Sequence, residues 1–128
     1  MPTTVRFLES DRVVESLYSG SVGSDEFAHS VERAIDLATA HVSFLFLSDL
    51  TDLEKGPAPG DLFAMIQMLE TRGLPRTLRE ALVVSPRFPD PGDAQFYEDA
   101  CRNRGWDIRI FPDRRSGLAW LLEKGSRT

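Results

Sequence analysis

The sequence predicts an α/β fold with a mixed, mostly parallel five-stranded sheet and four helices, in the order β-β-α-β-α-β-α-β-α. Short apolar segments that favour strands alternate with longer segments whose apolar residues recur at the helical period. Glycine, proline or a helix-capping residue marks most of the boundaries between them. Because helices separate the strands after the first pair, most neighbouring strands should be parallel.

The first two segments predict a β-hairpin. Residues 5–9 and 12–18 are rich in β-branched and aromatic residues, and Ser10-Asp11 between them favours a tight turn. The glycines of residues 20–23 end this pattern. We expect the hairpin to form an antiparallel edge of the sheet.

The next part of the chain predicts a helix, a buried strand and a long loop. Residues 24–40 have apolar side chains at the helical period and acidic residues in the first turn, where the helix dipole favours them. The apolar run 42–47 is typical of a strand that helices cover on both faces. Residues 48–60 contain two prolines and two glycines, so they predict a loop longer than most connections in α/β proteins.

The second half of the chain continues the alternation with clear helix boundaries. Gly73 and Pro75 stop one helix, Pro91 suits the first position of the next, and Asp113 can cap the last. The predicted elements are helix 61–72, strand 79–85, a helix from Pro91 to Gly105, strand 107–111 and helix 114–124.

The composition is that of a globular protein, and it argues against several classes of partner. The 128 residues suffice for one domain, spanning 1–128, and 41% of them are hydrophobic. The formal net charge of −5 argues against nucleic acid or an anionic membrane as the main partner. No apolar run could cross a bilayer, and residues 1–12 do not resemble a signal peptide. The single cysteine, Cys101, suggests a reducing, cytoplasmic compartment.

The C-terminal residues add a more specific pattern. The short strand that ends at Phe111 is followed by polar residues and then by Gly117-Leu118-Ala119-Trp120-Leu121. Together with the element order, this pattern resembles the SpoIIAA-like branch of the STAS superfamily, which includes bacterial anti-sigma-factor antagonists. That branch usually has alanine where this chain has Gly117. The resemblance implies a STAS-like fold and a non-enzymatic, regulatory role in binding a protein partner. Self-association through the edge strand or through helix 61–72 is a further possibility.

The resemblance also implies that the predicted loop 48–60 and the helix after it form the contact surface. STAS antagonists carry a phosphorylatable serine or threonine just before this helix, but residues 58–62 of this chain contain no hydroxyl. The usual phosphorylation switch is therefore not expected, although Ser48 and Thr51 lie at the other end of the loop. Asp61 is either a permanent negative charge in place of a phosphate or a helix-capping residue.

Two side chains of helix 61–72 extend its apolar face. Phe63 and Met68 flank the stripe of residues that should face the core, which is typical of an adaptable binding surface or of contact with a neighbouring helix or the long loop. The predicted partner-binding residues are Asp49, Thr51, Asp61, Phe63 and Met68. As an alternative, this helix could close a pocket for a small apolar ligand or lipid.

No catalytic, cofactor or metal site is expected. The chain has neither a phosphate-binding loop nor a nucleophile motif. His29 and His41 are not spaced for metal binding with cysteine or carboxylates. Cys101 lies beside the apolar face of its helix and should be buried, whereas Trp120 should either cover another element or act as a surface anchor.

Overall fold

The structure is a computed structural model that describes residues 3–56, 58–85 and 91–123. Its elements follow the predicted order, which is therefore confirmed. They are β1 (Thr3–Leu8), β2 (Val13–Ser21), α1 (Ser24–His41), β3 (Leu45–Lys55), α2 (Pro59–Thr71), β4 (Arg79–Val83), α3 (Pro91–Asn103), β5 (Asp107–Phe111) and α4 (Arg114–Leu121).

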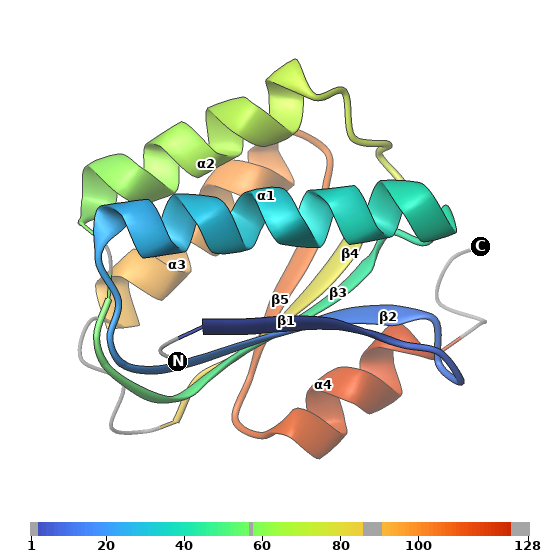
Figure 1. Ribbon diagram of the computed structural model, residues 1–128, viewed down its shortest axis with the longest axis horizontal. Helices are drawn as coiled ribbons and strands as arrows, with labels where there is room; N and C mark the ends of the chain where they lie inside the picture. The colour runs from blue at the N-terminus through green and yellow to red at the C-terminus, as the bar shows by residue number, and fades with distance from the viewer. Residues whose placement is uncertain (1–2, 57, 86–90, 124–128) are drawn as a thin grey trace.

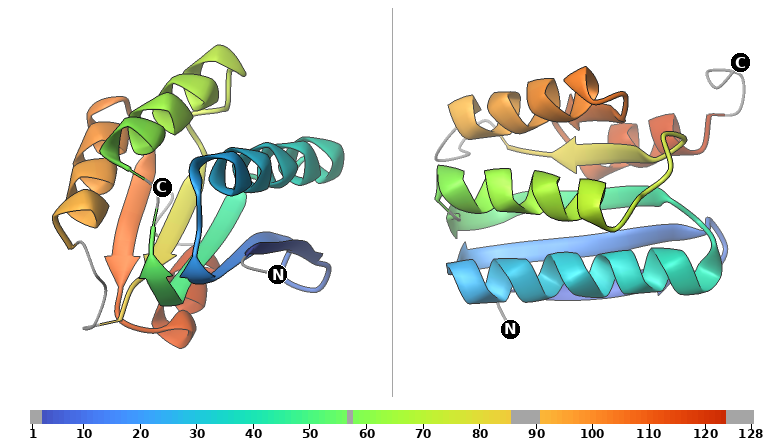
Figure 2. Two further views of the ribbon diagram at one scale, coloured as in Figure 1. Left: turned by 60° about the vertical axis from the view of Figure 1, so that its left-hand side comes forward. Right: turned by 90° about the horizontal axis from the view of Figure 1, so that it is seen from above.

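The five strands form one sheet in the order β1-β2-β3-β4-β5. β1 and β2 pair antiparallel as the predicted hairpin, and the other neighbours pair parallel. Helices α1, α2 and α3 cover one face of the sheet, and α4 lies alone on the other (Figures 1 and 2). The predicted mixed, mostly parallel sheet is therefore confirmed.

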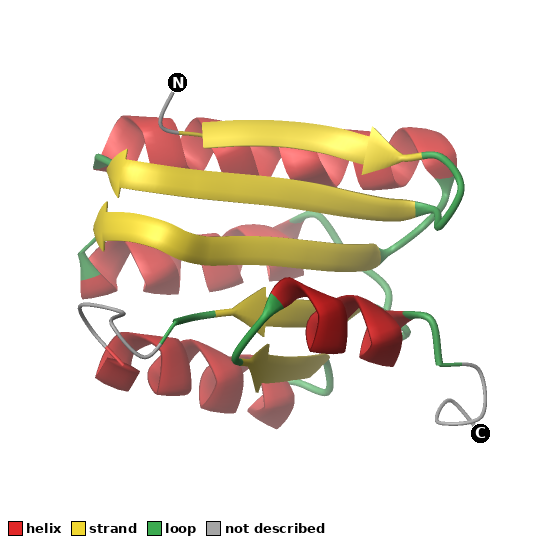
Figure 3. Cartoon of the chain, turned by 90° about the horizontal axis from the view of Figure 1, so that it is seen from below, coloured by secondary structure: helices red, strands yellow, loops and turns green. Residues whose placement is uncertain are grey.

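Each face of the sheet has its own hydrophobic core. The larger core lies under α1, α2 and α3, where Ile35, Ile66 and Ile108 are almost fully buried. The smaller core lies under α4, which packs on β3, β4 and β5 (Figure 3). Its buried members are Val13, Leu47, Ala81, Val83, Trp120 and Leu121.

Helix α4 approaches the sheet closely because of Gly117. A Cβ atom at this position would lie 3.2 Å from Cβ of Ala81 and 3.3 Å from Cγ2 of Val83, so a larger side chain would push the helix outward. Trp120 is only 6% exposed and packs against Phe111, with 5.5 Å between ring centroids. The alternative that Trp120 is a surface anchor is therefore wrong.

The predicted loop 48–60 is wrong for most of its length. β3 continues to Lys55, and residues of its second half pair with the end of β2, as in Ser19 with Asp52 and Gly20 with Leu53. The glycines and prolines that suggested a loop all follow Lys55 in the sequence. The polar residues before them are tolerated in a strand because α4 does not extend over this part of the sheet (Figure 3). A one-sided strand can present polar residues to solvent. Only the short segment before α2 is left as a connection.

Among the described residues, no helix is both long enough and apolar enough to cross a membrane.

Candidate ligand-binding site

Polar side chains interrupt the larger core near the middle of the sheet. Ser16 on β2 and Ser48 on β3 are direct partners in the strand register. Glu80 on β4 is buried, and its carboxylate oxygen Oε2 accepts a 2.6 Å hydrogen bond from Oγ of Ser48. The three side chains thus share the sheet face under α1, α2 and α3. Carboxylates are rarely buried without an ionic partner, so this group calls for an explanation.

Glu80 also receives a hydrogen bond from the helix above it. The hydroxyl of Tyr97 on α3 donates to the second carboxylate oxygen, Oε1. Burial raises the pKa of Glu80 above its ordinary value of 4.5, and the hydrogen bonds from Ser48 and Tyr97 lower it only in part. The carboxyl group therefore keeps its proton to a higher pH than an exposed glutamate.

The phenol and thiol groups around Glu80 remain protonated at neutral pH. Burial raises the pKa of Tyr18 to about 12, and burial together with the nearby Glu80 raises the pKa of Tyr97 well above 10.0. The same two causes raise the pKa of Cys101 to about 12. Because a thiol with so high a pKa is a poor nucleophile, this cluster is suited to binding and not to thiol chemistry. The prediction that Cys101 is buried is confirmed.

A cavity of about 80 Å³ lies beside these polar groups, between the sheet and the helices. Its walls are mainly apolar, with Ser16, Ser48, Glu80 and the two tyrosines as polar members. The lining residues are Ser16, Tyr18, Phe27, Val31, Ala34, Ile35, Phe46, Ser48, Leu50, Met65, Leu69, Leu78, Glu80, Leu82 and Tyr97. A second cavity of about 60 Å³ lies between α1 and α2 and shares Phe27, Val31 and Met65 with the first.

Polar contacts join α1 and α2 near both ends of α2. The hydroxyl of Ser24 donates a 2.8 Å hydrogen bond to Asp61, and Arg72 forms a 3.0 Å ion pair with Asp36. Asp61 also accepts a 3.0 Å hydrogen bond from the backbone N–H of Ala58 at the start of α2. Asp61 therefore caps its helix and links it to α1.

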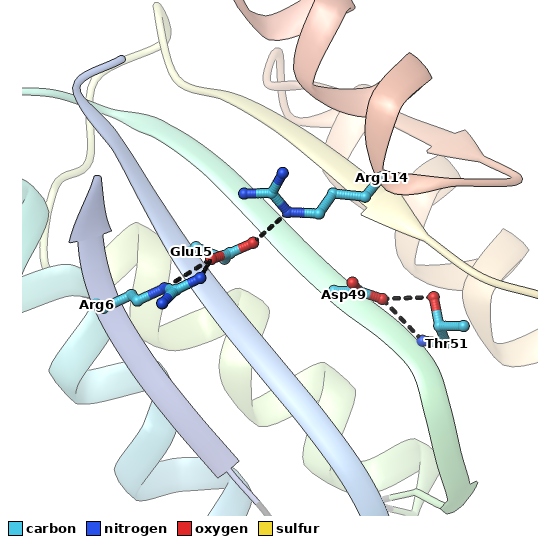
Figure 4. Close-up of polar contacts among 5 residues, drawn as sticks. All are labelled: Arg6, Glu15, Asp49, Thr51 and Arg114. Atoms are coloured by element: carbon cyan, nitrogen blue, oxygen red, sulfur yellow. Dashed lines mark hydrogen bonds and ion pairs between the residues drawn. The ribbon is translucent and has the colours of Figure 1, made fainter. Parts of the chain in front are cut away.

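The predicted partner-binding residues do not form one surface. Because Ser48 points to the cavity, the next residue, Asp49, points to the opposite face of the sheet. Asp49 accepts hydrogen bonds from the backbone N–H and the hydroxyl of Thr51, at 3.0 and 2.5 Å (Figure 4). Phe63 and Met68 belong to α2, on the other side of the sheet. Phe63 is 46% exposed, whereas Met68 is half-buried and lines the cavity between α1 and α2.

The face that carries Asp49 also contains a buried acid that sequence reasoning missed. Glu15 on β2 is fully buried and forms ion pairs of 2.8 Å with Arg6 and 2.6 Å with Arg114 (Figure 4). Burial raises the pKa of Glu15, but hydrogen bonds and charge attraction from Arg114 and Arg6 outweigh that effect, so its pKa lies below 4.5. This cluster connects the hairpin to α4, and each oxygen of its buried carboxylate is paired with a guanidinium group.

Glu80 and Tyr97 were missed as well, although the sequence contains a signal for Glu80. It lies within a strand predicted to be buried, where a charged residue needs a special reason. Tyr97 gives no comparable signal, because a tyrosine on the apolar face of a helix is ordinary. Within the described part of the chain, no group of three or more histidine, cysteine, aspartate or glutamate residues is placed to hold a metal ion.

The sheet order and the helices on its two faces define an α/β fold of the SpoIIAA-like class. No protein-family model matches the sequence, and no curated protein is significantly similar to it. The structure is similar to the crystal structure of an uncharacterized DUF3478-family protein from Shewanella loihica PV-4, which has a SpoIIAA-like fold. The TM-score is 0.59 and the sequence identity 17%, over 93% of this chain and 91% of the other. The predicted SpoIIAA-like fold is thereby confirmed.

Proposed function

We propose that this protein binds a small, mainly apolar molecule in the cavity between the sheet and the helices α1 and α2. The proposal rests on one observation: the buried Glu80 carboxyl lies at a cavity and has only hydroxyl partners among the described residues. Apolar walls with a few convergent polar groups and perturbed pKa values are typical of small-molecule sites.

The energetics of Glu80 support the same proposal. A buried carboxyl without an ionic partner lowers the stability of the folded protein, and an apolar residue at this position would avoid that penalty. A ligand group bound to the free lone pairs of the carboxyl would recover part of the loss. We therefore interpret the polar row of Ser16, Ser48 and Glu80 as a recognition feature.

Filling the cavity should abolish binding. Ala34 on α1 is buried and lines the cavity, so Ala34→Leu should occupy most of its volume and weaken the binding of 1-propanol, used as a small probe, at least tenfold. The chemical shift of the Met65 methyl group, followed by NMR during titration, reports binding. Ala40→Leu introduces the same side chain at an exposed position of the same helix and should leave binding unchanged. Equal probe affinity in the wild type and in Ala34→Leu would contradict the proposal.

A second candidate function is the protein contact that the STAS resemblance implies, with the outer face of α2 as its surface. The exposure of Phe63 supports this candidate, because a large apolar side chain that is half exposed to water is a common anchor of protein contacts. Met68 is not part of this surface, since it packs against the core cluster. Asp49 and Thr51 lie on the other side of the sheet and would need a different partner.

Phe63→Ser should abolish a contact made through α2 and leave the free energy of unfolding within about 0.5 kcal/mol of the wild type, because the side chain is exposed. Met68→Ser should instead lower the free energy of unfolding by about 1–2 kcal/mol, because it removes a half-buried apolar side chain. Light scattering tests self-association, and a comparative pull-down tests other partners. An unchanged oligomeric state together with an unchanged set of bound proteins in Phe63→Ser would refute this candidate.

A further inference from the structure

The geometry points to a small organic cation, such as a short alkylammonium ion, as the class of ligand that the cavity beside Glu80 prefers. This inference rests on the proposed ligand-binding function and adds the charge of the ligand to it. Three features support it: the charge balance of the walls, the free acceptor sites of Glu80 and the aromatic rings that line the cavity.

The charge of the cavity walls depends on Glu80. Among the described residues that line it, Glu80 is the only acid, and there is no lysine, arginine or histidine. The neighbouring Arg79 lies on the opposite face of the sheet, where its guanidinium group is 4.1 Å from the centre of the Trp120 ring. A ligand carboxylate or phosphate would therefore meet a carboxyl group without a compensating cation, which is strongly unfavourable in a buried site.

The acceptor sites of Glu80 suit a cationic donor. Each of its two oxygens receives one hydrogen bond, from Ser48 or from Tyr97, while an ionised carboxylate offers about four acceptor positions. An alkylammonium group has three N–H donors and no acceptor, so it can use the remaining positions. Oγ of Ser16 belongs to the same wall and can accept a further hydrogen bond.

Aromatic rings from four different elements complete the walls. Tyr18 comes from β2, Phe27 from α1, Phe46 from β3 and Tyr97 from α3. The faces of such rings attract cations, and aromatic cages are a common solution for binding alkylated ammonium groups. The remaining lining residues of α1 and α2 are apolar. The alkyl part of the ligand can contact them.

Binding should be coupled to loss of one proton. Burial raises the pKa of Glu80, so the free protein holds a neutral carboxyl over a wider pH range. The balanced step is Glu80–COOH + R–NH₃⁺ → Glu80–COO⁻···⁺H₃N–R + H⁺. The titratable groups that face Glu80 are Tyr18 on β2 and Tyr97 and Cys101 on α3, and their raised pKa values keep them protonated. Affinity should therefore increase as the pH rises through the pKa of Glu80.

The size of the cavity limits the ligand to a few non-hydrogen atoms. Its volume of about 80 Å³ is smaller than the engineered cavity of about 150 Å³ that accepts benzene. The n-propylammonium ion is a suitable probe, with 1-propanol and propionate as neutral and anionic analogues of similar shape. A ligand of this size should bind with a Kd no tighter than about tens of micromolar, so titrations must reach millimolar concentrations.

The test compares the three probes by NMR titration of the wild type, of Glu80→Gln and of Glu54→Gln, at constant ionic strength. In the wild type, n-propylammonium should bind at least tenfold more tightly than 1-propanol, and propionate should not bind. Glu80→Gln should abolish this preference, while Glu54→Gln, which changes an exposed glutamate in the same way, should retain it. Calorimetry of the wild type in two buffers with different ionisation enthalpies should detect proton release with the ammonium probe alone.

The outcomes separate this inference from the proposed function. If 1-propanol binds as tightly as n-propylammonium, or propionate binds best, the charge preference is refuted and the ligand site remains. If no probe binds, both are refuted. If Glu80→Gln fails to fold, two measurements on the wild type still test the inferred preference for a cation. They are the comparison of the three probes and the release of a proton.

Discussion

Replacing Trp120 with alanine should lower the free energy of unfolding by about 3–5 kcal/mol, as expected for removing a buried tryptophan. Trp120 is the largest side chain between α4 and the sheet, and it is 6% exposed. Its ring packs against Phe111, and the guanidinium groups of Arg79 and Arg109 lie 4.1 and 5.0 Å from its centre. The substitution removes these contacts together and leaves a cavity under a helix of only 8 residues.

Urea unfolding followed by far-ultraviolet circular dichroism measures this effect. Leu122→Ala is the matched control, because Leu122 lies just after α4 and is 38% exposed, so its loss should lower stability by no more than about 1 kcal/mol. A loss below about 1 kcal/mol for Trp120→Ala would mean that α4 is held mainly by other contacts. The ion pair between Glu15 and Arg114 would then be the first candidate.

The element order was predictable because local signals and the fold agree. Gly73 and Gly105, which follow α2 and α3, have φ values of 65° and 92°, a backbone conformation that favours glycine. The same residues mark the helix ends in the sequence. The apolar residues 81–84 predicted a buried strand from the sequence. In the structure, all five residues of β4 are buried. Such signals depend on neighbours in the sequence alone.

The second half of β3 could not be predicted in the same way. Its polar residues are typical of a loop, and only pairing with the end of β2 makes them part of a strand. The pairing includes a register shift between Leu17 and Ser19, which is a tertiary feature. Leu50 and Leu53 both pack against the larger core although they are three residues apart, so the alternation expected of a strand is absent.

The candidate ligand-binding site could not be predicted from the sequence for a related reason. Ser48 and Tyr97 are 32 and 17 residues from Glu80 in the chain, and no motif connects them. The register of β2, β3 and β4 and the packing of α3 bring them together. The structure places the residues of the predicted loop-and-helix surface on two faces of the sheet, because residues 48–51 belong to β3 and alternate between those faces. Only the α2 part of that surface remains as a candidate.

Replacing Glu80 with glutamine should increase the free energy of unfolding at pH 7, by about 1.4 kcal/mol for each unit by which burial raises the pKa of this carboxyl, because the amide cannot ionise. Glutamine has nearly the same shape, and the hydroxyls of Ser48 and Tyr97 can accept hydrogen bonds from its amide as well as donate to it. The same variant should lose the preference for the ammonium probe. Greater stability together with weaker binding is typical of a residue kept for function.

The effect of Glu80→Gln on stability should depend on pH. The pKa of Glu80 is raised in the folded protein above its ordinary value of 4.5, which applies to the unfolded chain. At a pH between 4.5 and the raised pKa, the folded state therefore binds more protons than the unfolded state. The stability of the wild type should therefore fall as the pH rises through this window, and Glu80→Gln should remove that fall. Glu15 acts in the opposite direction, because its pKa is lowered and its contribution is lost as the pH falls below 4.5. It is present in both proteins, so it cancels in their difference.

Urea titrations of the wild type, Glu80→Gln and Glu54→Gln from pH 4 to pH 8 measure that difference directly. The advantage of Glu80→Gln over the wild type should be near zero at pH 4 and grow as the pH rises, whereas the exposed Glu54→Gln control should show no such trend. A variant that is less stable than the wild type at pH 7 would show that the hydrogen bonds from Ser48 and Tyr97 outweigh the cost of burying the carboxyl. Glu80 would then be a structural residue, because its burial would no longer require a ligand to explain it.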